Sequence, residues 1–227
     1  MEKSMRIKNF LFFTLVFVSS FAVVASAAVR PRSYPKRYQP VEETHSIHIR
    51  YEPQKPFPLL QEQVGPVMGM GSIKDIRTHR QRIGHSLSSG MVSSHFKSDP
   101  FPLEKAILES LSATLPRFGV KFIPVSDWDG RAETLKEQGS DSILKIDIQR
   151  FWTEGRVARG TNVVNTSIYL IFQLGVKKQN RVFKRNFYII KEKTISEFTP
   201  EEVEQTINHV LTEIFDDFFS NPYGTQR

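Results

Sequence analysis

Apolar and polar side chains alternate through the middle of the chain. In segment 166–176 every second residue is apolar, and this set is Ile168, Leu170, Phe172, Leu174 and Val176. Because successive side chains of a strand point to opposite faces, a period of two predicts a strand with one face against a core. Segments 143–152 and 182–191 alternate in the same way, which predicts an antiparallel three-strand meander. In the first strand we expect one set on the core face: Leu144, Ile146, Ile148 and Trp152. The connection 153–160 is expected to be a mobile loop.

Two segments show a helical period instead. Apolar residues recur every three or four positions over 101–118, with Ser98 or Asp99 as the expected cap and Gly119 at the end. Segment 200–219 carries a capping box, Thr199 with Glu202, ahead of a wide apolar stripe. Both helices are predicted to bury their stripes on the sheet.

Shorter patterns complete the prediction. Strands are expected at 47–51, 64–76 and 120–125, a weak helix at 128–138, and a long loop rich in Ser, Gly and His at 77–97. The fold class predicted is α+β: a mixed, largely antiparallel sheet with a C-terminal three-strand meander, one face of which is covered by two main helices.

The first 27 residues have the three parts of a secretory signal. A basic start precedes an apolar run over 10–24, and Ala25-Ser26-Ala27 is a small-x-small cleavage site. An uncleaved anchor is the alternative, but the run is short for the roughly 20 residues of a spanning helix. We therefore expect cleavage after Ala27 and no transmembrane span in the mature protein. The predicted organisation is signal peptide 1–27, flexible basic and Pro-rich arm 28–45, single α+β domain 46–222 and tail 223–227.

Composition narrows the chemistry. The chain has no cysteine, which excludes disulfides, thiolate catalysis, thiolate zinc sites and lipidation on cysteine. Its formal net charge of +7 favours anionic surfaces such as lipid head groups or cell-wall polymers. An exported protein rarely meets nucleic acid, so none is expected as a partner.

Catalytic motifs are missing. The glycines near Met70 fit neither phosphate-loop spacing, and no G-x-S-x-G elbow occurs. The histidines match no zinc spacing and are expected to be exposed loop residues. We predict no enzyme, no cofactor and no metal. One basic cluster is a candidate contact for an anionic ligand, or alternatively protects an exposed turn: Lys177, Lys178, Arg181, Lys184 and Arg185.

Short motifs carry a family likeness. The run from Met70 to Arg77, then Arg82-Ile83-Gly84, followed later by Phe118-Gly119-Val120 and by the meander starting at Ile143, resembles the YajG-type bacterial envelope lipoproteins. The likeness implies a periplasm-facing, non-enzymatic α/β domain, although the lipidated cysteine of that family is absent here.

Three residues match the shared motif: Asp75, Arg77 and Gly84. We expect Asp75 and Arg77 to pair and to fix the following loop.

Two functions are consistent with these features. The first is a periplasmic binding or adaptor module of the cell envelope, which could associate with the outer membrane and could contact an envelope protein or an anionic lipid or cell-wall surface. The second is an accessory subunit of an envelope lipid or glycan transport system. The sequence does not predict an oligomeric state.

Overall fold

The computed structural model describes residues 42–88, 91–125, 128–158, 160–196 and 198–224. The predicted signal peptide and most of the predicted arm lie outside these residues. Within this part of the chain eight strands form one sheet: β1 Glu43–His48, β2 Val67–Asp75, β3 Gly84–Ser88, β4 Met91–Asp99, β5 Lys121–Pro124, β6 Ser142–Ala158, β7 Thr161–Val176 and β8 Arg181–Ile195. The α-helices are α1 Leu60–Val64, α2 Leu103–Thr114 and α3 Pro200–Ser220, and the 3-10 segments are η1 Leu115–Phe118, η2 Glu133–Glu137 and η3 Lys177–Gln179.

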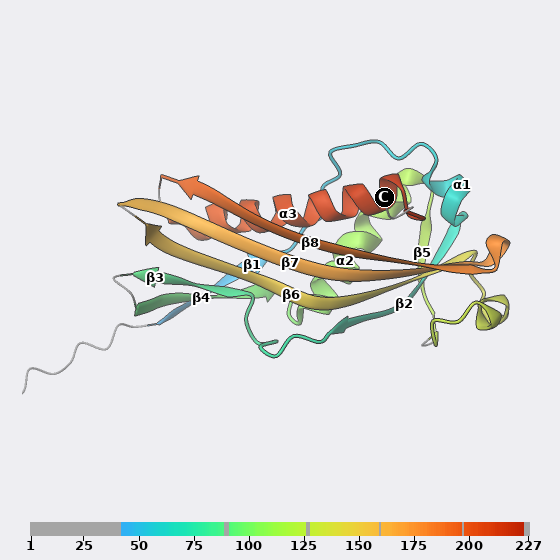
Figure 1. Cartoon of the computed structure of the whole chain (residues 1–227), viewed down its shortest axis with the longest axis horizontal. Helices are drawn as coiled ribbons and strands as arrows, with labels where there is room; N and C mark the ends of the chain where they lie inside the picture. Colours follow the sequence, from blue (N-terminus) through green and yellow to red (C-terminus); the bar gives the residue numbers. More distant parts are fainter. Residues whose placement is uncertain (1–41, 89–90, 126–127, 159, 197, 225–227) are drawn as a thin grey trace, which may run out of the picture. The chain divides into compact units, whose positions relative to one another are not determined.

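The meander predicted from alternation is confirmed and is longer than expected. Strands β6, β7 and β8 pair antiparallel along almost their full lengths (Figure 1). The pairing of β6 with β7 runs on to Ala158 and Thr161, so most of the predicted mobile loop 153–160 is strand. The prediction failed there because glycines and charged residues interrupt the apolar alternation of this segment. Its strand conformation depends instead on pairing with β7.

Strand β6 supports two strands along its other edge. The first half of β6 pairs with β2, and its second half pairs with β3, both in parallel. The rest of the sheet continues from β3 through β4 to β1, and from β2 to β5. Its longest pairings are antiparallel, so the sheet is mixed and largely antiparallel, as predicted.

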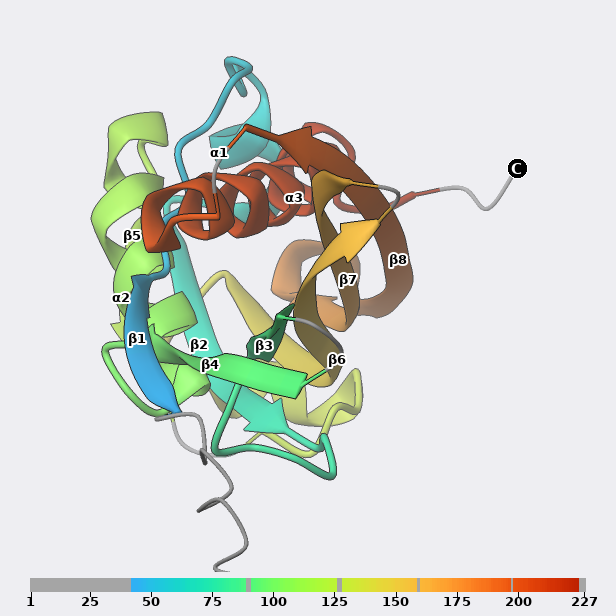
Figure 2. The same ribbon diagram turned by 90° about the vertical axis from the view of Figure 1, so that its left-hand side faces the viewer.

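The two main helices cover one face of this sheet. Figure 2 shows α3 in the hollow of the curved strands β6 to β8, with α2 beside β2. Phe172 of β7 lies at the centre of the core, 4.4 Å from Phe218 and 5.7 Å from Phe215 between ring centroids. Burial of such rings is worth about 1.5–3 kcal/mol each, and it contributes to holding the 21-residue helix α3 on the strands.

Ends and edges follow local chemistry. The Thr199 side chain caps α3 by accepting from the Glu202 N–H at 3.3 Å, as predicted. The cap predicted for α2 is wrong: Pro102 occupies the cap position and makes no side-chain hydrogen bond. The predicted weak helix 128–138 forms only the 3-10 segment η2. The predicted tail begins at Tyr223, and the ring of Tyr223 packs on that of Phe183, with 4.6 Å between the ring centroids.

The predicted loop 77–97 is also wrong, because most of it is a hairpin. Strands β3 and β4 pair antiparallel, and they gain partners from β6 and β1 on either side. His95, expected in an exposed loop, is a buried residue of β4 that bonds Glu42 at 2.7 Å. Next to β4, the edge strand β1 begins at Glu43, so the last three residues of the predicted arm belong to a strand.

Candidate functional site

Asp75 and Arg77 form a buried ion pair where β2 ends. The Arg77 Nη2 lies 2.6 Å from Asp75 Oδ2, and its Nε lies 2.8 Å from Asp75 Oδ1. The remaining nitrogen, Nη1, donates to the carbonyl oxygens of Phe151 at 2.8 Å and Arg82 at 3.0 Å. The Phe151 carbonyl belongs to the stretch of β6 between the end of β2 and the start of β3, where no strand pairs with β6 on the edge opposite β7. Arg77 therefore supplies a donor that the sheet lacks at this point.

Gly84 lies beside this pair, at the start of β3. A Cβ at this position would stand 2.0 Å from the Thr153 carbonyl oxygen, so only glycine lets β3 approach β6. The structure thus brings Asp75, Arg77 and Gly84 to one junction, where two strands meet end to end along β6.

Substitution of Gly84 by alanine should destabilise the domain by about 1–3 kcal/mol, because the clash is with backbone and the pairing of β3 with β6 must open. Chemical denaturation of the purified domain measures this. Gly139→Ala is the matched control, since a Cβ there meets nothing within 4 Å. Equal stability of the two variants would contradict the assignment of Gly84.

A β-bulge in β6 lies next to the junction. Ile148 pairs with Leu170 and Arg150 pairs with Tyr169, so Gln149 is an extra residue without a partner. The bulge reverses the alternation: Phe151 is fully buried, whereas Arg150 and Trp152 face away from α3. The prediction that Trp152 lies on the core face is wrong for this reason.

The face of the meander opposite α3 carries an exposed aromatic group. Tyr188 and Ile190 of β8 are 57% and 56% exposed, and the rings of Tyr188 and Tyr169 lie 5.6 Å apart. The register places Arg150 beside Tyr169, and Trp152 in a row with Ser167 and Ile190. We call five residues the aromatic face: Arg150, Trp152, Tyr169, Tyr188 and Ile190.

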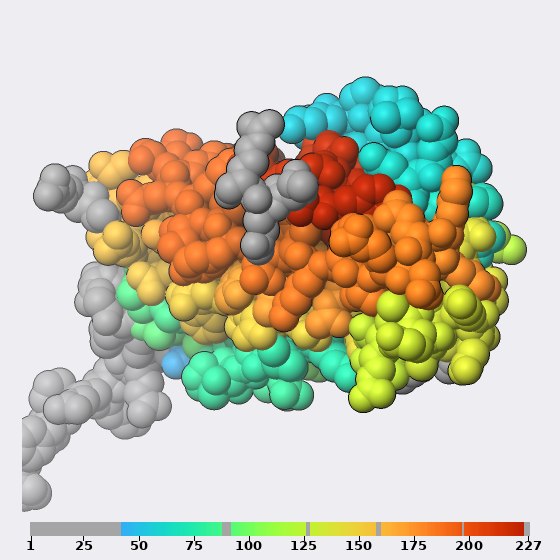
Figure 3. Space-filling view, turned by 45° about the vertical axis from the view of Figure 1, so that its right-hand side comes forward, coloured from blue at the N-terminus to red at the C-terminus, as the bar shows by residue number. Residues whose placement is uncertain are grey.

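One end of this side of the sheet is covered. Trp128 and Leu135, from the segment around η2, pack over Gly175 of β7 and contact Ile143 and Val182. Figure 3 shows this segment in yellow-green against the orange and yellow strands. The aromatic face lies along the strands beyond that cover, within the part of the chain that the structure describes.

The predicted basic cluster does not form a single site. Lys177 donates to the Gln138 carbonyl at 2.8 Å. Arg185 donates to the Asp217 and Asn221 carbonyls at the end of α3, where a cation also meets the negative end of the helix dipole. Arg181 lies 5.5 Å from the Phe183 ring centroid, on the same side as Arg185, and Lys178 is exposed in the turn. Lys184 lies on the opposite side of β8, with the aromatic face.

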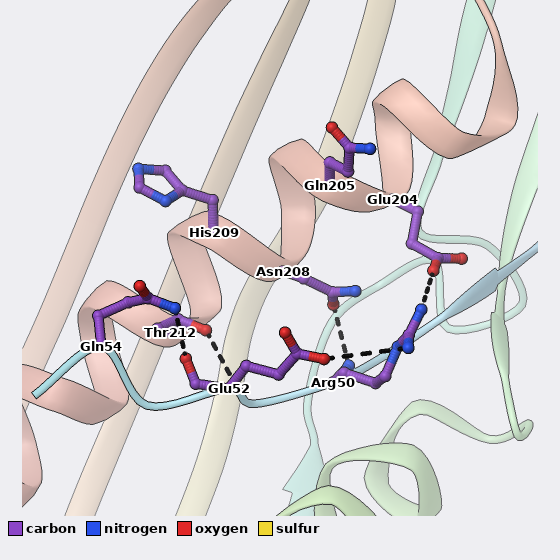
Figure 4. Close-up of a pocket in the computed structure, with 8 residues that line it drawn as sticks. All are labelled: Arg50, Glu52, Gln54, Glu204, Gln205, Asn208, His209 and Thr212. Carbon is purple, nitrogen blue, oxygen red and sulfur yellow. Dashed lines mark hydrogen bonds and ion pairs between the residues drawn. The ribbon is translucent and has the colours of Figure 1, made fainter.

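A polar cavity of about 350 Å³ lies between α3 and residues 48–54, which we call the strap (Figure 4). Most of its polar side chains already have partners. Four residues of α3 at a spacing of four face the strap: Glu204, Asn208, Thr212 and Asp216. They accept hydrogen bonds from the backbone N–H groups of alternate strap residues: His48, Arg50, Glu52 and Gln54.

The spacings match because four helical residues rise about 6 Å and two extended residues span about 6.6 Å. The strap is therefore held as a strand would be, with helix side chains in place of a neighbouring strand. This arrangement explains the cavity as a structural contact, and it was missed because its two halves are about 160 residues apart.

No group of histidine, aspartate and glutamate residues within the described ranges could hold a metal ion. His85 lies against Trp152, 5.3 Å between ring centroids, and 3.8 Å from Glu154. Burial lowers the pKa of His85, and the Glu154 carboxylate partly opposes that shift. His85 thus supports the position of Trp152.

Within the described part of the chain, no helix has both the length and the hydrophobicity needed to cross a bilayer.

No protein-family model matches the sequence, and no curated protein matches it. Solved structures show similar chain arrangements at low identity. Protein XCC0632 from Xanthomonas campestris, of family DUF330, is 15% identical over 78% of this chain and 92% of its own, with a TM-score of 0.48. Lipoprotein GNA1162 from Neisseria meningitidis is 12% identical over 66% of this chain and 98% of its own, with a TM-score of 0.37.

A Helicobacter pylori homolog of a neuraminyllactose-binding hemagglutinin is 14% identical over 77% of this chain and 90% of its own, with a TM-score of 0.40. Similarity at this level assigns neither a family nor a function. Membership of the YajG-type family stays a prediction.

Proposed function

We propose that this chain is an exported, non-enzymatic module of the bacterial cell envelope that works in the periplasm by binding a protein partner through the aromatic face. The observation that carries the proposal is the exposure of Tyr188 and Ile190 beside Tyr169 and Trp152 on a sheet face that α2 and α3 leave open. Tyrosine, tryptophan and arginine are the residues that dominate binding energy at protein interfaces. The predicted signal peptide supports export.

The arrangement of polar and apolar side chains favours a binding function over a catalytic one. The strongest polar clusters, at Asp75 and Arg77 and along the strap, are closed on themselves by short hydrogen bonds. In contrast, the aromatic face exposes large side chains held rigid by strand pairing. A rigid apolar surface loses little entropy on binding, which suits it to a protein partner.

Photocrosslinking tests this function in envelopes of the native host. A photoreactive amino acid at Ile190 should form a discrete adduct of constant mass, whereas one at Lys105, exposed on α2, should not. Adding Tyr188→Asp should abolish the Ile190 adduct, because a carboxylate at the centre of the face cannot be desolvated without loss. No adduct at Ile190, or the same adducts from both positions, would refute the proposal.

A further inference from the structure

Arg150 is the one member of the aromatic face that carries a charge. Its Nε donates to the Ser167 hydroxyl at 2.6 Å, which restrains the guanidinium, and Arg150 pairs with Tyr169 in the register of the strands. Among the described residues, no hydrogen bond or ion pair engages its Nη1 and Nη2. The nearby Arg77 differs, because Asp75 neutralises it and its side chain is only 6% exposed. Arg150 therefore presents two free donors in a fixed plane, and a carboxylate is the group that matches them.

A cavity of about 250 Å³ adjoins Arg150 on the same side of the sheet. Arg150 itself lines it, together with Arg77, Thr78, His79, Gln149, Phe151 and Trp152. Sites for whole small ligands occupy about 300–1,000 Å³, so this cavity is of the size for one side chain or chain end of a larger partner. The bulge at Gln149 is what turns both Arg150 and Trp152 toward it.

We propose that Arg150 and this cavity bind a carboxylate of an acidic peptide segment in the protein partner. This inference rests on the proposed function, and it names the chemistry of the partner at the aromatic face. The segment would place an aspartate, a glutamate or a C-terminal carboxylate on the Arg150 guanidinium through two parallel hydrogen bonds. Its neighbouring apolar side chains would pack on Trp152, Tyr169 and Tyr188.

Charges around the site favour a peptide over a membrane surface. Lys184 lies on the same side, four residues along the strands from the row of Arg150, and Asp147 lies in the row between them. In the other direction, Glu154 and Glu192 occupy the row four residues away, about 13 Å along the strands, and Glu192 pairs there with Arg156 at 3.6 Å. An anionic bilayer that covered the whole face would meet both Asp147 and Glu154, whereas a short segment with one carboxylate contacts Arg150 without reaching Glu154.

Selection from a random peptide library displayed on phage tests the inference with the purified mature protein, residues 28–227. Peptides bound by the wild type should be enriched in aspartate or glutamate at one fixed position, next to apolar residues. A synthetic peptide from this selection should lose at least about tenfold in affinity for Arg150→Met, and less for Arg150→Lys, which keeps the charge but loses the paired geometry. Lys178→Met, at an exposed lysine in the turn, is the matched control and should bind like the wild type.

Three outcomes of the binding experiments would each overturn the inference. They are selected peptides without a fixed acidic residue, equal binding by Arg150→Met, and binding of phosphatidylglycerol vesicles but of no peptide. Arg150 is exposed and makes a single side-chain bond, so the variant should fold, and its thermal melting checks this. If Arg150→Met keeps the Ile190 crosslink, this inference fails and the proposed function stands. Loss of the wild-type crosslink itself would remove both.

Discussion

Replacement of Arg77 by methionine should destabilise the domain by about 3–5 kcal/mol. The change strips the buried Asp75 carboxylate, which is 1% exposed, of its cation, and it leaves the Phe151 carbonyl without a donor. A single buried charge without a partner is among the most costly defects in a folded protein. Urea denaturation followed by far-UV circular dichroism measures the loss.

Two further variants sharpen this test. Arg131→Met removes a surface cation that is 77% exposed and 3.7 Å from Asp129, and it should change stability by no more than about 0.5 kcal/mol. The double variant Asp75→Leu with Arg77→Met removes both charges and should be more stable than Arg77→Met alone. If Arg77→Met unfolds at the same urea concentration as the wild type, the pair does not support the junction.

Replacement of Asp216 by alanine should cost about 3 kcal/mol. This buried carboxylate of α3 accepts from the Tyr51 hydroxyl at 3.0 Å and from the Gln54 N–H at 3.0 Å, and hydrogen bonds to charged groups contribute about 1.5–3 kcal/mol each. Burial, reinforced by the Asp216 charge, raises the pKa of Tyr51, so the hydroxyl stays protonated and donates at neutral pH. Thermal and urea unfolding measure the effect.

The neighbouring residue provides the control for this prediction. Asp217 is 62% exposed and pairs only at the surface with Arg185, at 3.4 Å, so Asp217→Ala should cost less than about 1 kcal/mol. Tyr51→Phe removes one of the two bonds to Asp216 and should lie between the two aspartate variants. Equal losses at Asp216 and Asp217 would mean that the strap is not held by the helix side chains.

Elements with a strong local period could be predicted from the sequence. The alternation around Leu170 and Phe172 suffices for β7, and Thr199, Pro200 and the apolar stripe after them define α3. In both cases the residues that determine the element lie within it. The two helices and the meander, and with them the fold class, follow from such local signals.

Elements that depend on distant partners could not be predicted. The hairpin of β3 and β4 is rich in serine and histidine, and it is a hairpin because β6 and β1 pair with its outer edges. The bulge at Gln149 has no local signature either. It lies where β2 stops and Arg77, in place of a neighbouring strand, donates to the carbonyl of Phe151, 74 residues later in the chain.

The candidate site shows the same division. Asp75, Arg77 and Gly84 could be found from the shared motif. In the structure they lie beside the bulge at Gln149, and that bulge places Arg150 and Trp152 on the outer face of the sheet. The basic cluster was visible in the sequence, yet strand alternation separates Lys184 from Arg181 and Arg185. The alternation within β8 separates its two faces, and the packing of α3 determines which of them stays open.

Quenching of tryptophan fluorescence by acrylamide tests most directly whether the aromatic face is the binding surface. The chain has two tryptophans: Trp128 is 1% exposed and serves as the internal control, whereas Trp152 lies on the aromatic face. In the free protein acrylamide should quench the fluorescence of Trp152, whereas Trp128 should be protected. Saturation with the partner identified by crosslinking at Ile190 should protect Trp152 as well. Unchanged quenching of Trp152 in the saturated complex would contradict the account.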